Sequence, residues 1–147
     1  MAYDIYNIEN PLPGAGMGFT AGDLPGPMEQ EVFLQFLMAK LELQGVRYAG
    51  TPGRVISRVA VCGGSGSSLV GHAKRAGADA YITGDIRYHS FFEAGNDILL
   101  VDIGHYESEK YSLEILYEII TKKFPKFAVR FSKINTNPVN YLPAWKK

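Results

Sequence analysis

Three mainly apolar segments, each about as long as a buried strand, are separated by stretches with helical spacing. They cover residues 55–62, 80–83 and 98–103. Parallel neighbouring strands need a long crossover connection, usually a helix, between one strand and the next. Strands that are almost wholly apolar are typical of sheets covered by helices on both faces. The alternation therefore predicts an α/β fold, a layered sheet in which strands and helices follow one another.

The rest of the chain adds further elements to this pattern. Residues 11–27 contain five glycines and four prolines, which predicts a long loop. The helix expected over 107–124 carries one apolar stripe and ends at Pro125. The other expected elements are strands over 3–8, 46–50 and 127–131, and helices over 28–43, 68–76 and 87–94.

Composition narrows the class of protein. A chain of 147 residues with 46% apolar residues fits one domain, 1–147, with a sizeable core. Fifteen basic and fifteen acidic residues give no net charge, so neither nucleic acid nor a membrane is an expected partner. Cys62 is the only cysteine, which excludes an intramolecular disulfide. With no signal peptide and no apolar run of membrane-spanning length, we expect a cytoplasmic protein.

Ligands of open α/β sheets bind beyond the carboxyl ends of the strands, and three strand ends here carry chemically capable groups. The first is a turn formed by Gly63, Gly64, Ser65 and Gly66. Backbone amides and hydroxyls at a helix start can hold an anion such as a phosphate. The turn lacks the remaining residues of a P-loop or dinucleotide fingerprint, and a serine-capped turn without a ligand explains it equally well.

Asp85 and His89 follow the second strand end and lie at most about one helical turn apart. A carboxylate and an imidazole that face one cleft can both carry protons during catalysis. The alternative is that Asp85 caps the next helix while His89 packs against its neighbours.

His105 and Glu109 follow the third strand end, with a spacing of four residues. If a helix begins near Gly104, the imidazole and the carboxylate share one helix face. This pair suits a divalent metal, which accepts neutral imidazole nitrogen and carboxylate oxygen together. The alternative is a hydrogen bond within the helix, with acidic residues stabilising the helix amino terminus.

Several blocks of the chain resemble one known family in the same order. These blocks are Tyr3-Asp4-Ile5-Tyr6, Gly14-Ala15-Gly16-Met17-Gly18, residues 59–67, residues 77–85 with Tyr88-His89, and Gly104-His105-Tyr106-Glu107-Ser108-Glu109. They are similar to the NIF-three-like family (NGG-one-interacting factor three), whose bacterial members are often called GTP cyclohydrolase I type 2 homologues. The resemblance covers nearly the whole chain and implies the carboxyl-terminal lobe of such a protein.

The resemblance also implies a site and an assembly. The family holds two divalent metal ions, such as zinc, iron or manganese, between two lobes. The ligands that its carboxyl half supplies fall on His105 and Glu109, and Asp85 and His89 match residues of the same cleft. The amino-terminal lobe, with a histidine pair and an aspartate, is not in this sequence, so we expect weak or absent metal binding by the chain alone. Full-length members are expected to form homo-oligomers, such as a hexameric ring.

One difference from the family lies in the early loop. Family members often carry an arginine after Gly-x-Gly, where this chain has Met17 followed by Gly18 and Phe19. The missing guanidinium removes a candidate phosphate contact.

Three functions remain open from the sequence. The first is a metal-dependent hydrolase that acts on a nucleotide or another phosphorylated small molecule. The second is a non-catalytic metal-binding or protein-assembly module. The third, a dinucleotide-binding domain, is disfavoured by the incomplete glycine fingerprint.

Overall fold

The computed structural model describes residues 18–142 and forms one five-stranded sheet with helices on both sides. The strands are β1 (Thr20–Glu29), β2 (Arg47–Ala49), β3 (Val55–Ser65), β4 (Ala80–Gly84) and β5 (Leu99–Asp102). The α-helices are α1 (Gln30–Lys40), α2 (Val70–Arg75), α3 (His105–Glu109) and α4 (Ser112–Lys123), and the 3₁₀ helices are η1 (Ser67–Leu69) and η2 (Tyr88–Ala94). None of the helices in this described part is long and apolar enough to cross a membrane.

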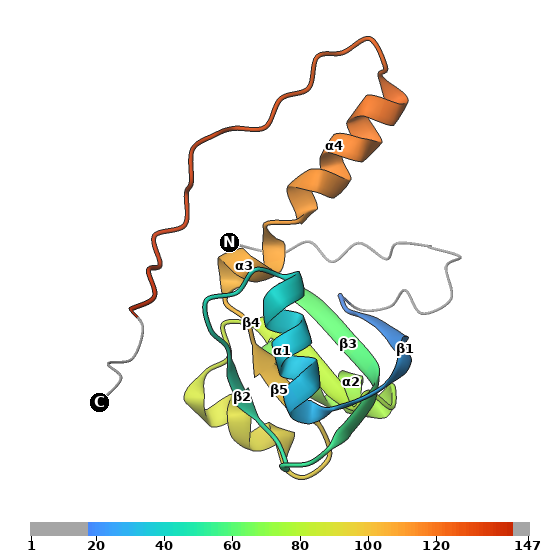
Figure 1. Cartoon of the computed structure of the whole chain (residues 1–147), viewed down its shortest axis with the longest axis vertical. Coiled ribbons are helices and arrows are strands. Elements are labelled where there is room, and N and C mark those ends of the chain that lie inside the picture. The colour runs from blue at the N-terminus through green and yellow to red at the C-terminus, as the bar shows by residue number, and fades with distance from the viewer. Residues whose placement is uncertain (1–17, 143–147) are drawn as a thin grey trace.

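The strand order in the sheet is β1-β3-β4-β5-β2. The three central strands run parallel, and β1 and β2 pair antiparallel at the two edges. Parallel neighbours bring the carboxyl ends of β4 and β5 to the same side of the sheet, where β5 hands over to α3 (Figure 1). The expected α/β fold with alternating strands and helices is confirmed.

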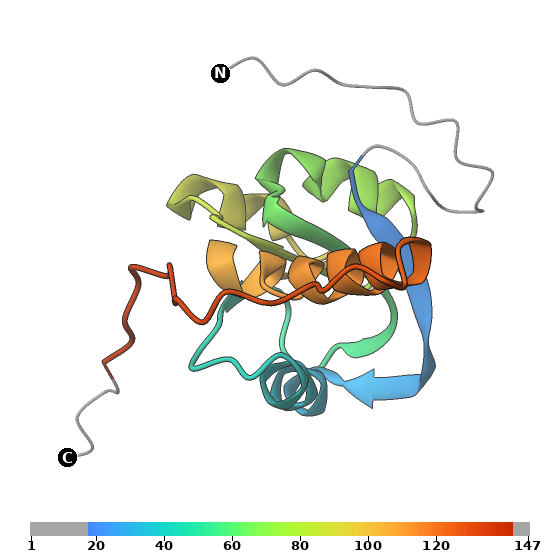
Figure 2. The ribbon, with the colours of Figure 1, turned by 90° about the horizontal axis from the view of Figure 1, so that it is seen from above.

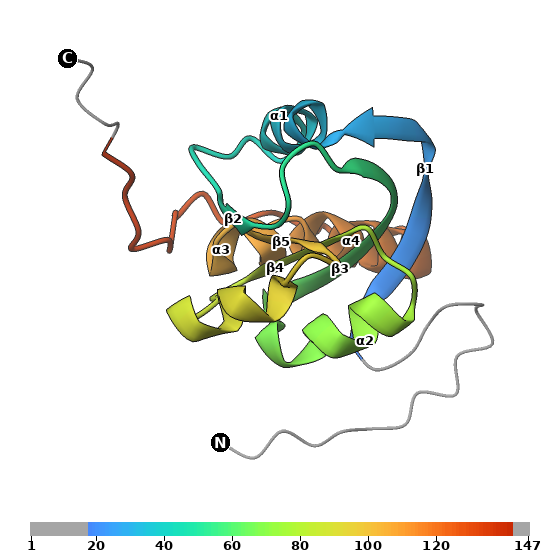
Figure 3. The ribbon, with the colours of Figure 1, turned by 90° about the horizontal axis from the view of Figure 1, so that it is seen from below.

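Both faces of the sheet are buried, as the apolar strand sequences predicted. Ile82 and Val101 point to one face and pack with Phe33 of α1. Their neighbours Tyr81 and Leu100 point to the other face, where a second apolar cluster includes residues of α2. Successive side chains of a strand alternate between faces, so both strands contribute to both clusters. Figure 3 shows α1 on one side of the sheet and α2 on the other.

The loop expected over residues 11–27 is wrong for its second half, because Thr20–Glu29 forms β1. Two of its prolines, Pro25 and Pro27, lie in a stretch where the pairing with β3 shifts register, between Asp23 and Met28. An edge strand tolerates proline because one side needs no ladder hydrogen bonds. The strand expected over 3–8 lies outside the described residues.

The helix expected over 107–124 is also corrected. It is divided into α3 and α4, and Lys110 and Tyr111 form a turn between them. Helical spacing in the sequence was present on both sides of this turn, so periodicity alone did not reveal the break. The helix expected over 87–94 is present as the 3₁₀ helix η2.

The final strand expected over 127–131 is not formed, since residues 128–142 belong to no helix or strand. The strand order of the sheet explains why no strand forms there. Strand β5 already has β4 on one side and β2 on the other, so the chain after α4 has no free position beside β5. Instead, α4 projects away from the sheet and the chain then runs back past the body of the domain (Figures 1 and 2).

The buried face of β5 allows a test of this architecture. Leu100 is fully buried in the α2-side cluster. We expect Leu100→Ala to lower the free energy of unfolding by about 2–5 kcal/mol, because the cavity left behind relaxes only partly. Val55→Ala, at a position that is 48% exposed, is the matched control and should change stability by less than about 1 kcal/mol. Urea unfolding of both variants checks this, and equal losses would contradict the assignment of the core.

Candidate metal centre

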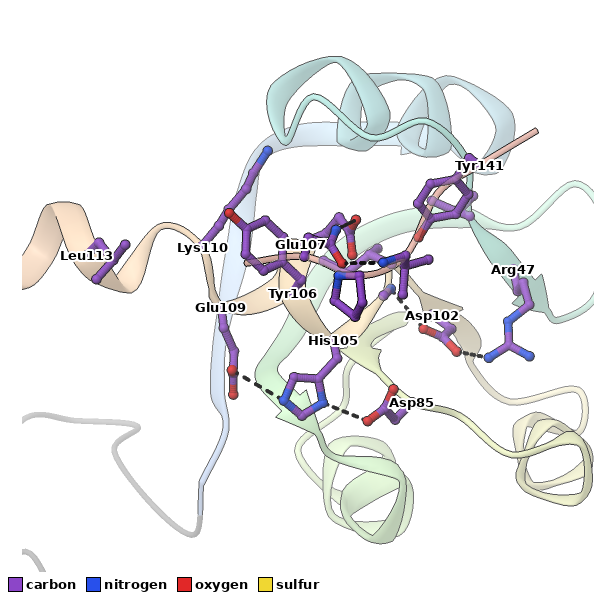
Figure 4. A pocket seen from close by; sticks show the side chains of 17 residues that line it. Arg47, Asp85, Asp102, His105, Tyr106, Glu107, Glu109, Lys110, Leu113 and Tyr141 are labelled. Atoms are coloured by element: carbon purple, nitrogen blue, oxygen red, sulfur yellow. Dashed lines mark hydrogen bonds and ion pairs between the residues drawn. The ribbon is translucent and has the colours of Figure 1, made fainter. Parts of the chain in front are cut away.

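The site is built where β4 and β5 end side by side. Asp85 follows the last residue of β4, and His105 begins α3 three positions after Asp102, the last residue of β5. The Nδ1 atom of His105 lies 2.6 Å from a carboxylate oxygen of Asp85, and its Nε2 atom lies 3.3 Å from a carboxylate oxygen of Glu109 (Figure 4). All three side chains are about half exposed. The imidazole is therefore held between two carboxylates at the protein surface.

Two glycines permit this close approach. A Cβ atom at Gly84 would lie 2.9 Å from the carbonyl oxygen of Gly104 and from the Cα of His105. Gly64 has a φ angle of 66°, and a Cβ there would lie 2.5 Å from a carboxylate oxygen of Glu109. At Gly84 only glycine leaves room for the backbone at the start of α3, and at Gly64 only glycine adopts the left-handed backbone without strain. The glycine-rich segment thus forms the floor beneath α3.

Ser108 ties α3 to this floor. Its hydroxyl donates to the carbonyl of His105 at 2.7 Å and accepts the backbone N–H of Gly64 at 2.8 Å. No local pattern marks Ser108 as a site residue, because its partner lies 44 positions away along the chain. Only its place inside the Gly104–Glu109 block of the family resemblance pointed to it.

The predicted anion site at Gly63, Gly64, Ser65 and Gly66 looks different in three dimensions. The first three residues belong to β3, and Gly64 donates to Ser108. The buried N–H of Gly66 donates to the Thr83 hydroxyl at 2.9 Å. Two of the amides counted for an anion therefore already have partners within the protein, and anion binding by this turn stays a prediction.

A buried carboxylate supports the two loops that carry the site. Asp102 is 4% exposed and accepts the backbone N–H groups of Ile86 at 3.0 Å and of Gly104 at 2.9 Å. It also forms an ion pair with Arg47 of β2. These contacts fix the backbone directly after Asp85 and directly before His105.

A cavity of about 840 Å³ adjoins the imidazole. Asp85, His105 and Glu109 line one part of it, and residues of the segment 137–141, including Tyr141, line another (Figure 4). Asn137 donates to Glu107 at 3.1 Å, which holds the segment around residue 137 against α3. The cavity has the size of a typical small-molecule site.

His89 is placed apart from this group. It lies exposed on η2, with its ring centroid 5.6 Å from that of Tyr88, and it does not line the cavity. Of the two predicted proton carriers, the structure brings only Asp85 to His105.

Few side chains in the described part of the chain could act as metal ligands together. Within residues 18–142, no group of three or more histidine, cysteine, aspartate or glutamate side chains is arranged to hold a metal ion. The two side chains that converge and that could hold a metal ion are His105, through Nε2, and Glu109, through its carboxylate. Asp85 occupies the opposite ring nitrogen.

Fold and site together define an α/β protein with a histidine–carboxylate group at the carboxyl ends of its parallel strands. The family model Duf34/NIF3 (NGG1p interacting factor 3) matches residues 4–138. The chain therefore belongs to the Duf34/NIF3 family, as the sequence blocks had indicated.

Individual relatives agree with this family. A GTP cyclohydrolase 1 type 2 homolog of Bacillus subtilis is 34% identical over 97% of this chain, and one of Mycobacterium tuberculosis is 37% identical over 95%. This chain spans only 39% and 38% of those proteins. Among solved structures, Staphylococcus aureus protein SA1388 superposes with a TM-score of 0.75 at 31% identity, over 84% of this chain and 43% of SA1388. A Bacillus cereus protein related to NIF3 gives 0.70 at 28% identity, over 83% of this chain and 35% of that protein.

The two carboxylates make the protonation of His105 testable in the metal-free chain. The hydrogen bond to Asp85 raises the pKa of His105 above its usual value, partial burial opposes this, and Glu109 adds to the increase. Since the folded-state pKa exceeds the unfolded value of about 6.5, the stabilisation is present below that pH and is lost as the pH rises through the folded-state pKa.

We expect nuclear magnetic resonance titration of the imidazole protons to give a pKa for His105 above that of an unperturbed histidine. Asp85→Asn should bring it down, because it removes both the hydrogen bond and the negative charge. An Asp85→Asn chain that titrates like the parent would show that this contact does not exist in solution.

Proposed function

We propose that this junction is half of a divalent metal centre, with His105 and Glu109 as ligands, and that it serves a hydrolase acting on a nucleotide or another phosphorylated small molecule. The observation that carries the proposal is the 3.3 Å separation of His105 Nε2 and the Glu109 oxygen. Two donors bound to one tetrahedral ion at about 2.0–2.2 Å lie roughly 3.3–3.6 Å apart. The pair thus has a spacing that suits a shared ion of zinc, iron or manganese.

The contact on the opposite ring nitrogen supports the same assignment. When the Nδ1–H of neutral His105 donates a hydrogen bond to Asp85, the lone pair of the ring lies on Nε2, facing Glu109. Histidine ligands commonly have such a carboxylate partner, which fixes the tautomer and the ring orientation. Asp85 is therefore a positioning residue for the ligand in this proposal.

A bound divalent ion would generate a hydroxide nucleophile at neutral pH and polarise an oxygen of the substrate. The chain's own residues orient the ligands. Ser108 and the two glycines hold α3 against β3, Asp102 fixes both loops, and the cavity beside the imidazole offers space for a substrate. The name of the curated relatives, GTP cyclohydrolase 1 type 2 homolog, agrees with a nucleotide as the substrate class.

A non-catalytic metal-binding or assembly module is the second candidate. It is favoured by the small number of donors within residues 18–142 and by the exposed apolar side chains of α4. A hydrolase predicts metal-dependent turnover that His105→Ala abolishes in a longer protein containing both lobes. A module predicts that partner binding survives this change.

For the 147-residue chain we expect weak binding of zinc and manganese, because two protein donors leave most coordination positions to water. His105→Ala and Glu109→Ala should each abolish it, and Asp85→Asn should weaken it about 10–100-fold by loosening the ring. His89→Ala is the matched control and should bind as the parent does. Calorimetric titration of the metal-free chain at pH 7 measures the affinity of the parent and of the four variants.

Two results would contradict the proposal. Binding that survives both His105→Ala and Glu109→Ala would place the metal elsewhere. Loss of binding in His89→Ala equal to that in His105→Ala would show that proximity to Asp85 does not define the site.

A further inference from the structure

One wall of the cavity beside His105 comes from a stretch of chain that belongs to no helix or strand. The residues that form this wall are Asn137, Pro138, Val139 and Tyr141. They lie in residues 135–141, which we call the wall segment. From residue 130 to residue 142, Asn137 is the one residue that is not exposed to solvent. The wall segment therefore packs most closely against the protein at Asn137.

The hydrogen bonds of Asn137 explain its place in the wall segment. Its side-chain Oδ1 accepts the backbone N–H of Val139 at 3.1 Å, and its own backbone N–H donates to Oδ1 of Asn135 at 2.9 Å. Such asparagine turns fix the backbone locally. Its side-chain Nδ2 donates to the carboxylate of Glu107 at 3.1 Å. Among the described residues, this last bond is the one hydrogen bond that joins residues 130–142 to the rest of the chain.

Glu107 has no role in the proposed metal centre. It lies two positions after His105 and two positions before Glu109, so its side chain leaves α3 on a different face from the one that those two residues share (Figure 4). Its carboxylate instead lines the cavity and holds Asn137. The acidic side chain between the two proposed ligands is thus directed to the wall segment.

Tyr141 shows how near the wall segment comes to the site. Its hydroxyl would lie 3.0 Å from a Cβ atom at Gly104, and the same Cβ atom would clash with the carboxylate of Glu107. Glycine at position 104 therefore leaves room for both side chains directly before His105. The wall segment covers the loop between β5 and α3, from which the proposed ligands start.

We propose that Glu107 is a positioning residue, which holds the wall segment against α3 through Asn137 and so keeps one side of the cavity closed. Because the attachment is one hydrogen bond between side chains, this side can open without unfolding a helix or a strand. A small molecule then enters or leaves between α3 and the wall segment. The proposal rests on the proposed function only in taking this cavity as the place of the substrate.

The test uses the metal-free chain of 147 residues and the variant Asn137→Asp. This change keeps the oxygen that accepts the Val139 N–H, but it replaces the donor to Glu107 by a second carboxylate. The open population of the wall segment should rise at least about tenfold, because a hydrogen bond to a charged acceptor is lost and a like charge takes its place.

Two further variants make the test specific. Asn135→Asp is the matched control, since it adds the same charge at an exposed residue of the same segment and keeps the oxygen that accepts the Asn137 N–H. It should behave as the parent does. The double variant Asn137→Asp with Glu107→Gln exchanges donor and acceptor, and it should restore the closed wall.

Nuclear magnetic resonance measures the position of the wall segment. Nuclear Overhauser contacts between the ring of Tyr141 and Gly104 should be present in the parent, the control and the double variant, and lost in Asn137→Asp. A neutral nitroxide dissolved in the solvent should relax the amide proton of Gly104 faster in Asn137→Asp than in the other three chains. Unchanged amide shifts of β3, β4 and β5 verify that each chain is folded.

An Asn137→Asp chain that keeps the contact between Tyr141 and Gly104 would overturn the proposal. Equal loss of the contact in Asn135→Asp would do so too, since charge anywhere in the segment would then open it. A double variant that stays open would show that Glu107 is not the partner. No metal is added and His105 and Glu109 are unchanged, so a failure here is distinguishable from a failure of the proposed metal centre.

Discussion

The geometry of the site depends on one buried carboxylate. Asp102 ends β5 inside the protein and accepts backbone N–H groups from the loop after β4 and from the loop after β5. Arg47 from the edge strand β2 compensates its charge. Burying a charged carboxylate is costly unless it has hydrogen-bond and charge partners. The two backbone N–H groups and Arg47 supply these partners for Asp102. Through them the ends of two parallel strands are held in register, and Asp85 and His105 are within hydrogen-bond distance.

Much of this fold could be predicted from the sequence, because short apolar segments that alternate with helical spacing have few ways to pack. The central strands β3, β4 and β5 and the helix α1 lie where periodicity indicated. The errors share a cause. Strand β1 contains prolines that an edge position tolerates, and residues 127–131 have a strand pattern but no free strand beside β5. Both outcomes depend on which neighbour each strand has in the sheet, and strand order is not written in local sequence.

In the candidate site, too, contacts within one segment could be predicted from the sequence, and contacts between distant segments could not. The pairing of His105 with Glu109 follows from a spacing of four residues on a helix, which local sequence reveals. The contributions of Ser108, Asp102 and Gly84 come from contacts between segments far apart in the chain, and no local pattern indicates them. His89 illustrates the reverse case, because nearness to Asp85 in sequence did not place its ring beside the carboxylate.

Asp85 adopts a left-handed backbone conformation, with a φ angle of 54°. An aspartate in that region is held at an energetic cost, which the surrounding contacts of Asp102 and Ile86 offset. Glycine would relieve that cost and remove the carboxylate beside the imidazole at the same time. The carboxylate beside the imidazole is therefore obtained at the expense of local backbone stability.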